Sequence, residues 1–428
     1  MAGRDKTATM RTLTGLGLAL LLGALVQHAW AQPPARLSNA DLGEPFLLQV
    51  NYFEHDGGLR NFNTSRSRIV RFERADATLR MLDDSDPSAT ASAPRLLAKI
   101  PIRGETEAGL ELDLNAGFDE ISLEEDRTGE DYYARADRHD RHSFRLLDRK
   151  VLSISCDGPL LVFDQEAKNE DGERLVVHYY LSRYRPDADF RPFEMKGLKH
   201  FGFYETYPQR RSGEWVQYAM KFNAGAPIVF ALSSSIPARY RDAVRDGVLY
   251  WNRALGEPLL RVIDAPPGVD APSPDYNVIE WITSGEYAST SYIQGDPLTG
   301  QILHAHVFVL RESMMNGDLE QQNDHLRYIV AHEIGHALGL RHNFAPAHLI
   351  TVMDYFSVPQ ILRVGRDIGA GESALPYDRE VIRHVYLGER LDVDGLPPFC
   401  TDGQKGCSPF RTKPPPESLG IKGGSPAE

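Results

Sequence analysis

Short apolar segments separated by polar turns dominate the chain from Phe46 to about Phe222. They are rich in Val, Ile, Leu, Tyr and Phe, and in several of them every second residue is apolar, as in a strand with one buried face. Clusters of Gly, Asp and Asn separate them. The segments are FLLQVNYF, SRIVRFER, ATLRML, HSFRLLDRKVLSI, LLVFDQE, RLVVHYYLSRY and WVQYAMKF. This pattern predicts a β-rich N-terminal region of sandwich or barrel type.

From Ala224 onward, predicted strands alternate with predicted helices. Runs rich in Val, Ile and Phe predict strands at 226–232, 277–282 and 301–310. Pro237 has the fixed φ that suits the first turn of a helix, and the apolar residues after it recur at steps of three and four. We expect Asp324 to cap a second helix that runs to about Leu338. A last helix is expected at about 377–387.

The segment AHEIGHALGLRH at 331–342 carries the predicted chemistry. His332 and His336 are four residues apart, so on a helix they are offset by only about 40° around the axis and project from one face. This separation suits two corners of a tetrahedral zinc site. Glu333 is next to His332, and we expect it to act as the general base on a water at the metal without binding the metal itself.

Gly339 stands where this helix is expected to end, because glycine adopts the positive φ of a sharp helix-terminating turn. The turn can bring His342 back toward the same metal as a third ligand. Three protein ligands leave one position for water, as in catalytic zinc sites, whereas structural sites have four ligands that are often cysteines. A surface helix that carries histidines by chance is the less favoured interpretation.

Soon after His342 the chain reads Val352-Met353-Asp354-Tyr355. With this segment the sequence resembles the metzincins, in which HExxHxxGxxH is followed by a methionine turn beneath the zinc. Within that clan it looks most like the bacterial Met-zincins. The similar stretches are IPARYRDAVRDGVLYWNRAL, DPLTGQILHAHV and HEIGHALGLRHNF, with HFGFYETY and PPFCTDG as weaker echoes.

The resemblance implies an exported metalloprotease with one catalytic zinc ion, a β-rich N-terminal region, and a catalytic domain built on a twisted mixed sheet. It makes Met353 the methionine of the turn. Tyr355 stands at the spacing of a tyrosine that in other metzincins ligates zinc or hydrogen-bonds the oxyanion, although a buried core tyrosine is an equal alternative. It also makes 301–310 the sheet-edge strand that pairs with substrate. His304 and His306 project from one face of that strand, where a solvated face is the favoured interpretation and contact with substrate the alternative.

The predicted function is that of a zinc-dependent endopeptidase acting on a protein or peptide substrate. Zinc lowers the pKa of water and polarises the carbonyl, while Glu333 would take the proton of the attacking water and deliver it to the leaving amine. One alternative is a zinc-binding scaffold without catalysis, which would have no use for Glu333. The other is an amidase that acts on a non-protein substrate, such as one in the cell wall.

The first residues and the net charge bear on location and partners. Three basic residues precede an apolar run at 16–26, and Ala29 and Ala31 match the small residues of a signal peptidase site. Because the run is shorter than the roughly 20 residues of a membrane span, we expect cleavage and a periplasmic or secreted protein without a stable membrane anchor. Cleavage would change the net charge from −13 to −15 by removing three basic residues and one acidic residue. This charge disfavours nucleic acid as a partner.

The three cysteines divide into a predicted pair and a single thiol. Export permits disulfides, and Cys400 and Cys407 flank the short polar loop TDGQKG, so we expect them to be bonded. Cys156 lies in a predicted strand, where a buried inert thiol is the expectation. A thiol that blocks the zinc as a latency switch is the less favoured alternative, because no local signature supports it.

These observations predict an α+β protein with four parts. Residues 1–31 are a signal peptide and residues 32–222 a β-rich, sandwich- or barrel-like domain. Residues 223–395 form a metzincin-like catalytic domain. Residues 396–428 contain the cysteine loop and a Pro-, Gly- and Ser-rich tail that we expect to be disordered.

Overall fold

The computed structural model describes most of the chain after the predicted signal peptide. The described residues are 35–56, 59–85, 94–118, 123–124, 143–157, 160–170, 172–196, 200–283, 289–310, 317–344, 350–391, 398–401, 404 and 407. The predicted signal peptide and the predicted disordered tail lie outside these ranges. No helix among these residues has both the length and the apolar character to cross a membrane.

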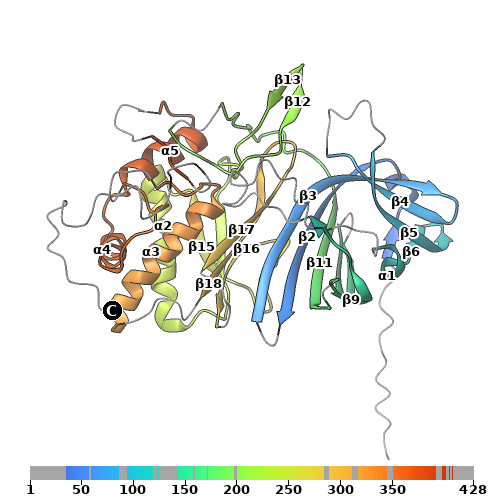
Figure 1. Ribbon diagram of the computed structural model, residues 1–428, viewed down its shortest axis with the longest axis horizontal. Coiled ribbons are helices and arrows are strands. Elements are labelled where there is room, and N and C mark those ends of the chain that lie inside the picture. The colour runs from blue at the N-terminus through green and yellow to red at the C-terminus, as the bar shows by residue number, and fades with distance from the viewer. Residues whose placement is uncertain are drawn as a thin grey trace, which may run out of the picture. The chain divides into compact units, whose positions relative to one another are not determined.

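Nine strands form one antiparallel sheet in the N-terminal region (Figure 1). Along the sheet the order is β1 (Ala35–Leu37), β6 (Gly109–Leu112), β5 (Arg95–Thr106), β4 (Thr78–Asp83), β3 (Leu59–Ala75), β2 (Pro45–Asp56), β11 (Arg174–Arg183), β10 (Leu160–Lys168) and β9 (Leu147–Asp157). The end strands β1 and β9 contact each other, so the sheet is nearly closed. The predicted β-rich, barrel-like region is therefore confirmed.

The inner face of this sheet buries the apolar residues that alternate along its strands. In β10 every second residue is buried, and the same period appears in β11 over Leu175 to Tyr179. The ring of Phe163 stacks on that of Tyr179 at 4.3 Å between centroids, and Phe118 meets both rings edge-on. Phe118 follows the single-turn helix α1 (Leu114–Gly117), which lies against β5 and β9.

A second, five-stranded sheet lies in the C-terminal half. Its order is β15 (Leu260–Asp264), β14 (Ile228–Leu232), β16 (Asn277–Ile282), β18 (Ile302–Leu310) and β17 (Thr290–Gly295). The first four strands are parallel to one another, whereas β17 is antiparallel to β18. The sheet is therefore mixed, as expected for a metzincin-like domain.

Four helices accompany this sheet (Figure 1). They are α2 (Arg241–Leu255), α3 (Leu319–Ala337), α4 (Val358–Gly369) and α5 (Pro376–Leu387). Helices α2 and α3 contact each other and the sheet, α2 through β15 and α3 through β17 and β18. Helix α4 packs against α2 and α3, and α5 packs against α2. Their buried residues form one hydrophobic core with the inner face of the sheet, in which Trp251 is fully buried and donates its indole N–H to the carbonyl of Ala331 at 2.8 Å.

The chain between the two sheets packs into this second core. Phe203, Ala219, Met220 and Phe222 belong to the same cluster as the buried residues of α2 and α3. The strand predicted for WVQYAMKF is regular only in the hairpin of β12 (Gln209–Arg211) and β13 (Glu214–Val216), after which isolated bridges take over. The domain boundary at residue 222 stays a prediction.

One prediction about the helices was wrong, and one helix was missed. Asp324 does not cap α3 but lies inside it, buried, with its carboxylate 2.9 Å from the guanidinium of Arg327. The N-cap is Asp318, which forms a capping box with Gln321: each side chain bonds the backbone N–H of the other residue. Helix α4 was not predicted, although Ser357 and Gln360 form a similar capping box.

The cysteines gave one confirmed and one wrong prediction. Cys400 and Cys407 are joined by a disulfide. Cys156 lies in a strand as expected, but its thiol is exposed and not buried, because β9 is an end strand of the sheet. Among the described residues, the cluster able to hold a metal consists of histidines, so the latency-switch alternative gains no support.

Candidate metal centre

The three predicted histidine ligands converge. Their Nε2 atoms form a triangle with edges of 3.1 Å between His332 and His342, 3.2 Å between His332 and His336, and 3.1 Å between His336 and His342. All three side chains are buried, at 4%, 6% and 1% exposure. Among the described residues, these three histidines form the cluster of side chains that could bind a metal ion.

The helix and the turn after it produce this convergence. His332 and His336 are one turn apart near the C-terminal end of α3, so their rings point to the same side. Gly339 then takes a φ of 99°, which L side chains rarely adopt, and a Cβ there would lie 2.0 Å from the carbonyl oxygen of Met220. The positive φ and this close approach both require glycine. The turn reverses the chain and brings His342 to the first two ligands.

The hydrogen bonds of the rings fix which nitrogens can bind metal. Nδ1 of His332 lies 2.7 Å from the carbonyl oxygen of Val352, and Nδ1 of His336 lies 2.9 Å from that of Leu340. A carbonyl oxygen only accepts, so each Nδ1 carries the proton and each neutral ring presents a lone pair at Nε2. Burial lowers the pKa of His336 and His342 well below the usual value for histidine, which favours this neutral form.

Zinc fits this donor set. Lone pairs only about 3 Å apart repel one another unless a cation lies between them. In a tetrahedral site with Zn–N distances of about 2.0–2.1 Å, two ligand nitrogens are about 3.3–3.4 Å apart, close to the observed edges of 3.1–3.2 Å. Second ring nitrogens that donate to backbone carbonyls are also typical of metal-binding histidines.

Residues 315–386 match the Met-zincin family model. The resemblance seen in the sequence is therefore confirmed over the segment that carries the motif. No curated protein matches the chain, and no solved structure matches it. The Met-zincin match and the three-histidine cluster together support a zinc metallopeptidase.

The turn that contains Met353 lies against α3, the helix that carries His332 and His336. Met353 is fully buried, and a Cβ placed on Gly335 would lie 2.2 Å from its sulfur. The carbonyl of Met353 accepts from the N–H of Asn343 at 2.9 Å, directly after the ligand His342. The turn thus contacts α3 between the first two ligands and is hydrogen-bonded to the loop that carries the third.

Glu333 lies on the helix that carries two of the ligands, and Tyr355 lies in the loop that follows Met353. Glu333 follows His332 in α3 and is 5% exposed. The ring of Tyr355 stacks on His332 at 5.6 Å between centroids and meets His342 at 4.6 Å and 61°. Because Tyr355 is 38% exposed, the alternative of a buried core tyrosine does not hold.

The expectation for the strand 301–310 was wrong. Strand β18 is not at the sheet edge, because it pairs with β16 on one side and β17 on the other. The edge strand on this side of the sheet is β17, and its Gln294 side chain bonds Asn51 and the carbonyl of Val50 in β2. Substrate pairing at β18 is therefore not available, because both of its hydrogen-bonding edges are used.

The two histidines of β18 are also less exposed than expected. His306 is 2% exposed, so the predicted solvated face is wrong for this residue. Burial lowers the pKa of His306 to about 3 and that of His304 to about 4. Both rings are therefore neutral near pH 7. His306 is buried opposite Tyr292 of β17, whereas His304 is half-buried.

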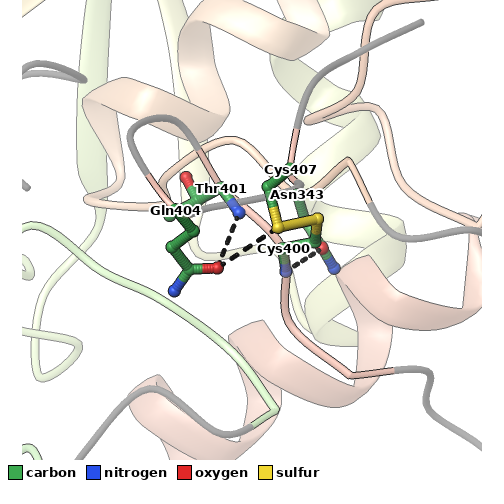
Figure 2. The surroundings of a disulfide bond; sticks show 5 residues. All are labelled: Asn343, Cys400, Thr401, Gln404 and Cys407. Carbon is green, nitrogen blue, oxygen red and sulfur yellow. Dashed lines mark hydrogen bonds between the residues drawn. A yellow bond between two sulfur atoms is a disulfide. The ribbon is translucent and has the colours of Figure 1, made fainter. Parts of the chain in front are cut away.

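Three contacts at the site were not predicted from the sequence. The hydroxyl of Tyr204 lies 3.1 Å from Nδ1 of His336, across 132 positions of the chain. Asp378, in the first turn of α5, accepts from the backbone N–H of Val352 at 2.9 Å. The disulfide loop lies beside the residues that follow His342 (Figure 2). No local pattern marks such long-range contacts, although HFGFYETY, which contains Tyr204, stood out as an echo of the family.

Proposed function

We propose that this protein is an exported zinc-dependent endopeptidase. The observation that carries the proposal is the triangle of three Nε2 atoms, 3.1–3.2 Å apart. In His332 and His336 the other ring nitrogen, Nδ1, donates to a backbone carbonyl. Three neutral imidazoles suit a catalytic ion that keeps one position for water. The Met-zincin match supports the same class of reaction.

A zinc ion bound by the three histidines would lower the pKa of water and polarise the substrate carbonyl. Glu333 would take the proton of the attacking water and pass it to the leaving amine. Its position in α3, directly after the ligand His332, supports this role, and so does its near-complete burial beside the three converging rings.

Tyr355 would donate its hydroxyl hydrogen to the oxygen that becomes negative in the tetrahedral intermediate. Two observations support this role: its ring lies against two of the three ligands, and its side chain keeps access to solvent. In this proposal Tyr355 contributes to the transition state and not to zinc binding, so its replacement by Phe should lower kcat while zinc content stays the same.

The test is cleavage of casein by the purified protein with and without a chelator, alongside Glu333→Gln. Gln keeps the size of the side chain but cannot accept a proton. We expect wild-type cleavage to stop with chelator and return with zinc, and Glu333→Gln to bind zinc but lose cleavage by at least about a hundredfold. Chelator-sensitive cleavage by Glu333→Gln at the wild-type rate would refute the mechanism.

Export is tested separately. Cell fractionation and N-terminal sequencing should find the protein outside the cytoplasm with Gln32 as its first residue, as cleavage after Ala31 predicts. A cytoplasmic protein that retains residues 1–31 would refute export and leave the zinc chemistry unaffected.

A further inference from the structure

The backbone at 202–204 pairs with the turn that leads to the third metal ligand. The N–H of Tyr204 donates to the carbonyl of Gly339 at 2.7 Å, and the N–H of Arg341 donates to the carbonyl of Gly202 at 3.1 Å. Phe203 and Leu340 form the antiparallel bridge between these bonds. These residues are far from the matched family segment in the sequence, yet they contact the metal-binding turn directly.

The opposite side of the segment 202–205 pairs with the backbone at 219–220. Met220 donates its N–H to the carbonyl of Tyr204 at 2.7 Å, and Glu205 forms a bridge with Ala219. Lys221 then pairs with Gln301 at the start of β18. Tyr204 therefore lies in a short three-stranded arrangement. Its hydrogen bonds and bridges fix its position relative to the turn at Gly339 and to the five-stranded sheet.

The side chain of Tyr204 points from this segment to a metal ligand. Its hydroxyl oxygen lies 3.1 Å from Nδ1 of His336, and its ring is tilted by 30° to the imidazole. The same Nδ1 lies 2.9 Å from the carbonyl oxygen of Leu340. Because Nε2 of His336 faces the other two ligands, the proton is on Nδ1, and it has two acceptors: the Leu340 carbonyl and the Tyr204 hydroxyl.

We infer that Tyr204 is a positioning residue for the metal centre, acting through His336. Its hydroxyl accepts from Nδ1–H, which holds the ring in the orientation that presents Nε2 to the ion and increases the electron density at that nitrogen. Removal of such a partner typically weakens metal binding by 10- to 100-fold. Because the Leu340 carbonyl remains, we expect about tenfold. The inference rests on the proposed zinc site but does not require peptidase activity.

The test compares full-length wild-type protein with Tyr204→Phe, which removes only the hydroxyl. Zinc affinity is measured by competition with a chromophoric chelator, and the absorption bands of the cobalt-loaded protein report the ligand field. We expect about tenfold weaker zinc binding, shifted cobalt bands and an unchanged melting temperature of the metal-free protein. Tyr184→Phe is the matched control, because it loses a hydroxyl bond to Asp296, 2.9 Å long, away from the metal centre.

Two outcomes would overturn the inference. One is wild-type zinc affinity together with unshifted cobalt bands in Tyr204→Phe. The other is a metal-free melting temperature lowered enough to explain the weaker binding, which would make Tyr204 a packing residue only. The proposed function fails differently: wild-type protein that binds zinc but cleaves no peptide would refute peptidase activity and leave the role of Tyr204 intact.

Discussion

The imidazole of His332 donates from Nδ1 to the carbonyl oxygen of Val352, 2.7 Å away, and Val352 directly precedes the methionine of the turn. The first metal ligand is thus oriented by the backbone of the turn. The N–H of the same Val352 donates to the carboxylate of Asp378. A substitution in the turn should therefore alter the orientation of His332 through this backbone, even where the substituted side chain does not contact the ligands.

Gly335→Ala should disturb the metal centre through Met353. A Cβ at position 335 would lie 2.2 Å from the sulfur of Met353 and 2.7 Å from the ring of Trp251, both fully buried. Overpacking of this kind costs about 1–3 kcal/mol, and it displaces α3 between two ligands. We expect a lower free energy of unfolding in urea and weaker zinc binding.

The control for this prediction is Gly104→Ala in β5, where a Cβ would make only an ordinary contact of 3.5 Å. It should unfold close to wild type. A Gly335→Ala protein with wild-type stability and zinc affinity would show that the contact between α3 and the turn adapts without consequence.

Metal removal should lower the stability of the folded protein. Zinc that binds the native state and not the unfolded chain adds about 2.7 kcal/mol when free zinc is at 100 times its dissociation constant. We expect a chelator to lower the melting temperature of wild type and to leave His342→Ala unchanged, because that variant has lost one of the three converging nitrogens. Equal chelator-induced shifts in the two proteins would contradict the assignment of His342 as a ligand.

The metal motif was predictable because its geometry is local. The spacing of His332 and His336 and the turn at Gly339 depend on helix period and on the one residue type that takes a positive φ readily. The start of the helix was misplaced because its first turn, after Asp318, shows no apolar stripe; Leu319 there is 48% exposed. The signal that was present is the spacing of Asp318 and Gln321 in the capping box.

Strand order was not predictable from local pattern. The apolar runs locate β16 and β18 well. Nothing in these runs indicates that β17, which precedes β18 in the chain, pairs with the outer side of β18 and forms the edge of the sheet. The exposure of the Cys156 thiol was not predicted for a similar reason, because the alternation of apolar and polar residues identifies a strand but not its place in the sheet. Tyr204 and Asp378 reach the site through long-range contacts that one sequence does not encode locally.

Removal of the disulfide should weaken zinc binding as well as folding. The N–H of Cys400 donates to the side chain of Asn343 at 3.1 Å (Figure 2). The N–H of Phe344 donates to the carbonyl of Cys400 at 2.6 Å. The cysteine loop is therefore hydrogen-bonded to the two residues after His342. For a short loop with a sequence separation of 7, chain entropy alone accounts for about 2 kcal/mol.

We expect Cys400→Ser combined with Cys407→Ser to lower the free energy of unfolding and to release zinc faster to a chelator. Cys156→Ser is the control, because that thiol is exposed in the N-terminal sheet and should change neither quantity. Zinc release at the wild-type rate from the double variant would mean that the loop does not help to hold His342.

Asp378 should make stability fall as pH rises from about 4 to about 6. Burial raises the pKa of this carboxyl from 3.8 to about 6, although Thr351, Tyr250 and the N–H of Val352 donate to it. A folded-state pKa above the unfolded value means that the native protein binds more protons in this range, so ionisation costs stability as pH rises. A rise of the pKa from 3.8 to about 6 corresponds to about 3 kcal/mol of stability.

Asp378→Asn keeps a neutral acceptor at all pH values, so the variant should gain about 3 kcal/mol relative to wild type between pH 4 and pH 7. Urea unfolding of both metal-free proteins at several pH values measures this difference, and the titration of the histidines cancels between them. Asp148→Asn is the control, because burial is negligible at that carboxylate and its pKa is lowered by Lys168. A difference between wild type and Asp378→Asn that stays constant with pH would show that Asp378 is ionised throughout this range.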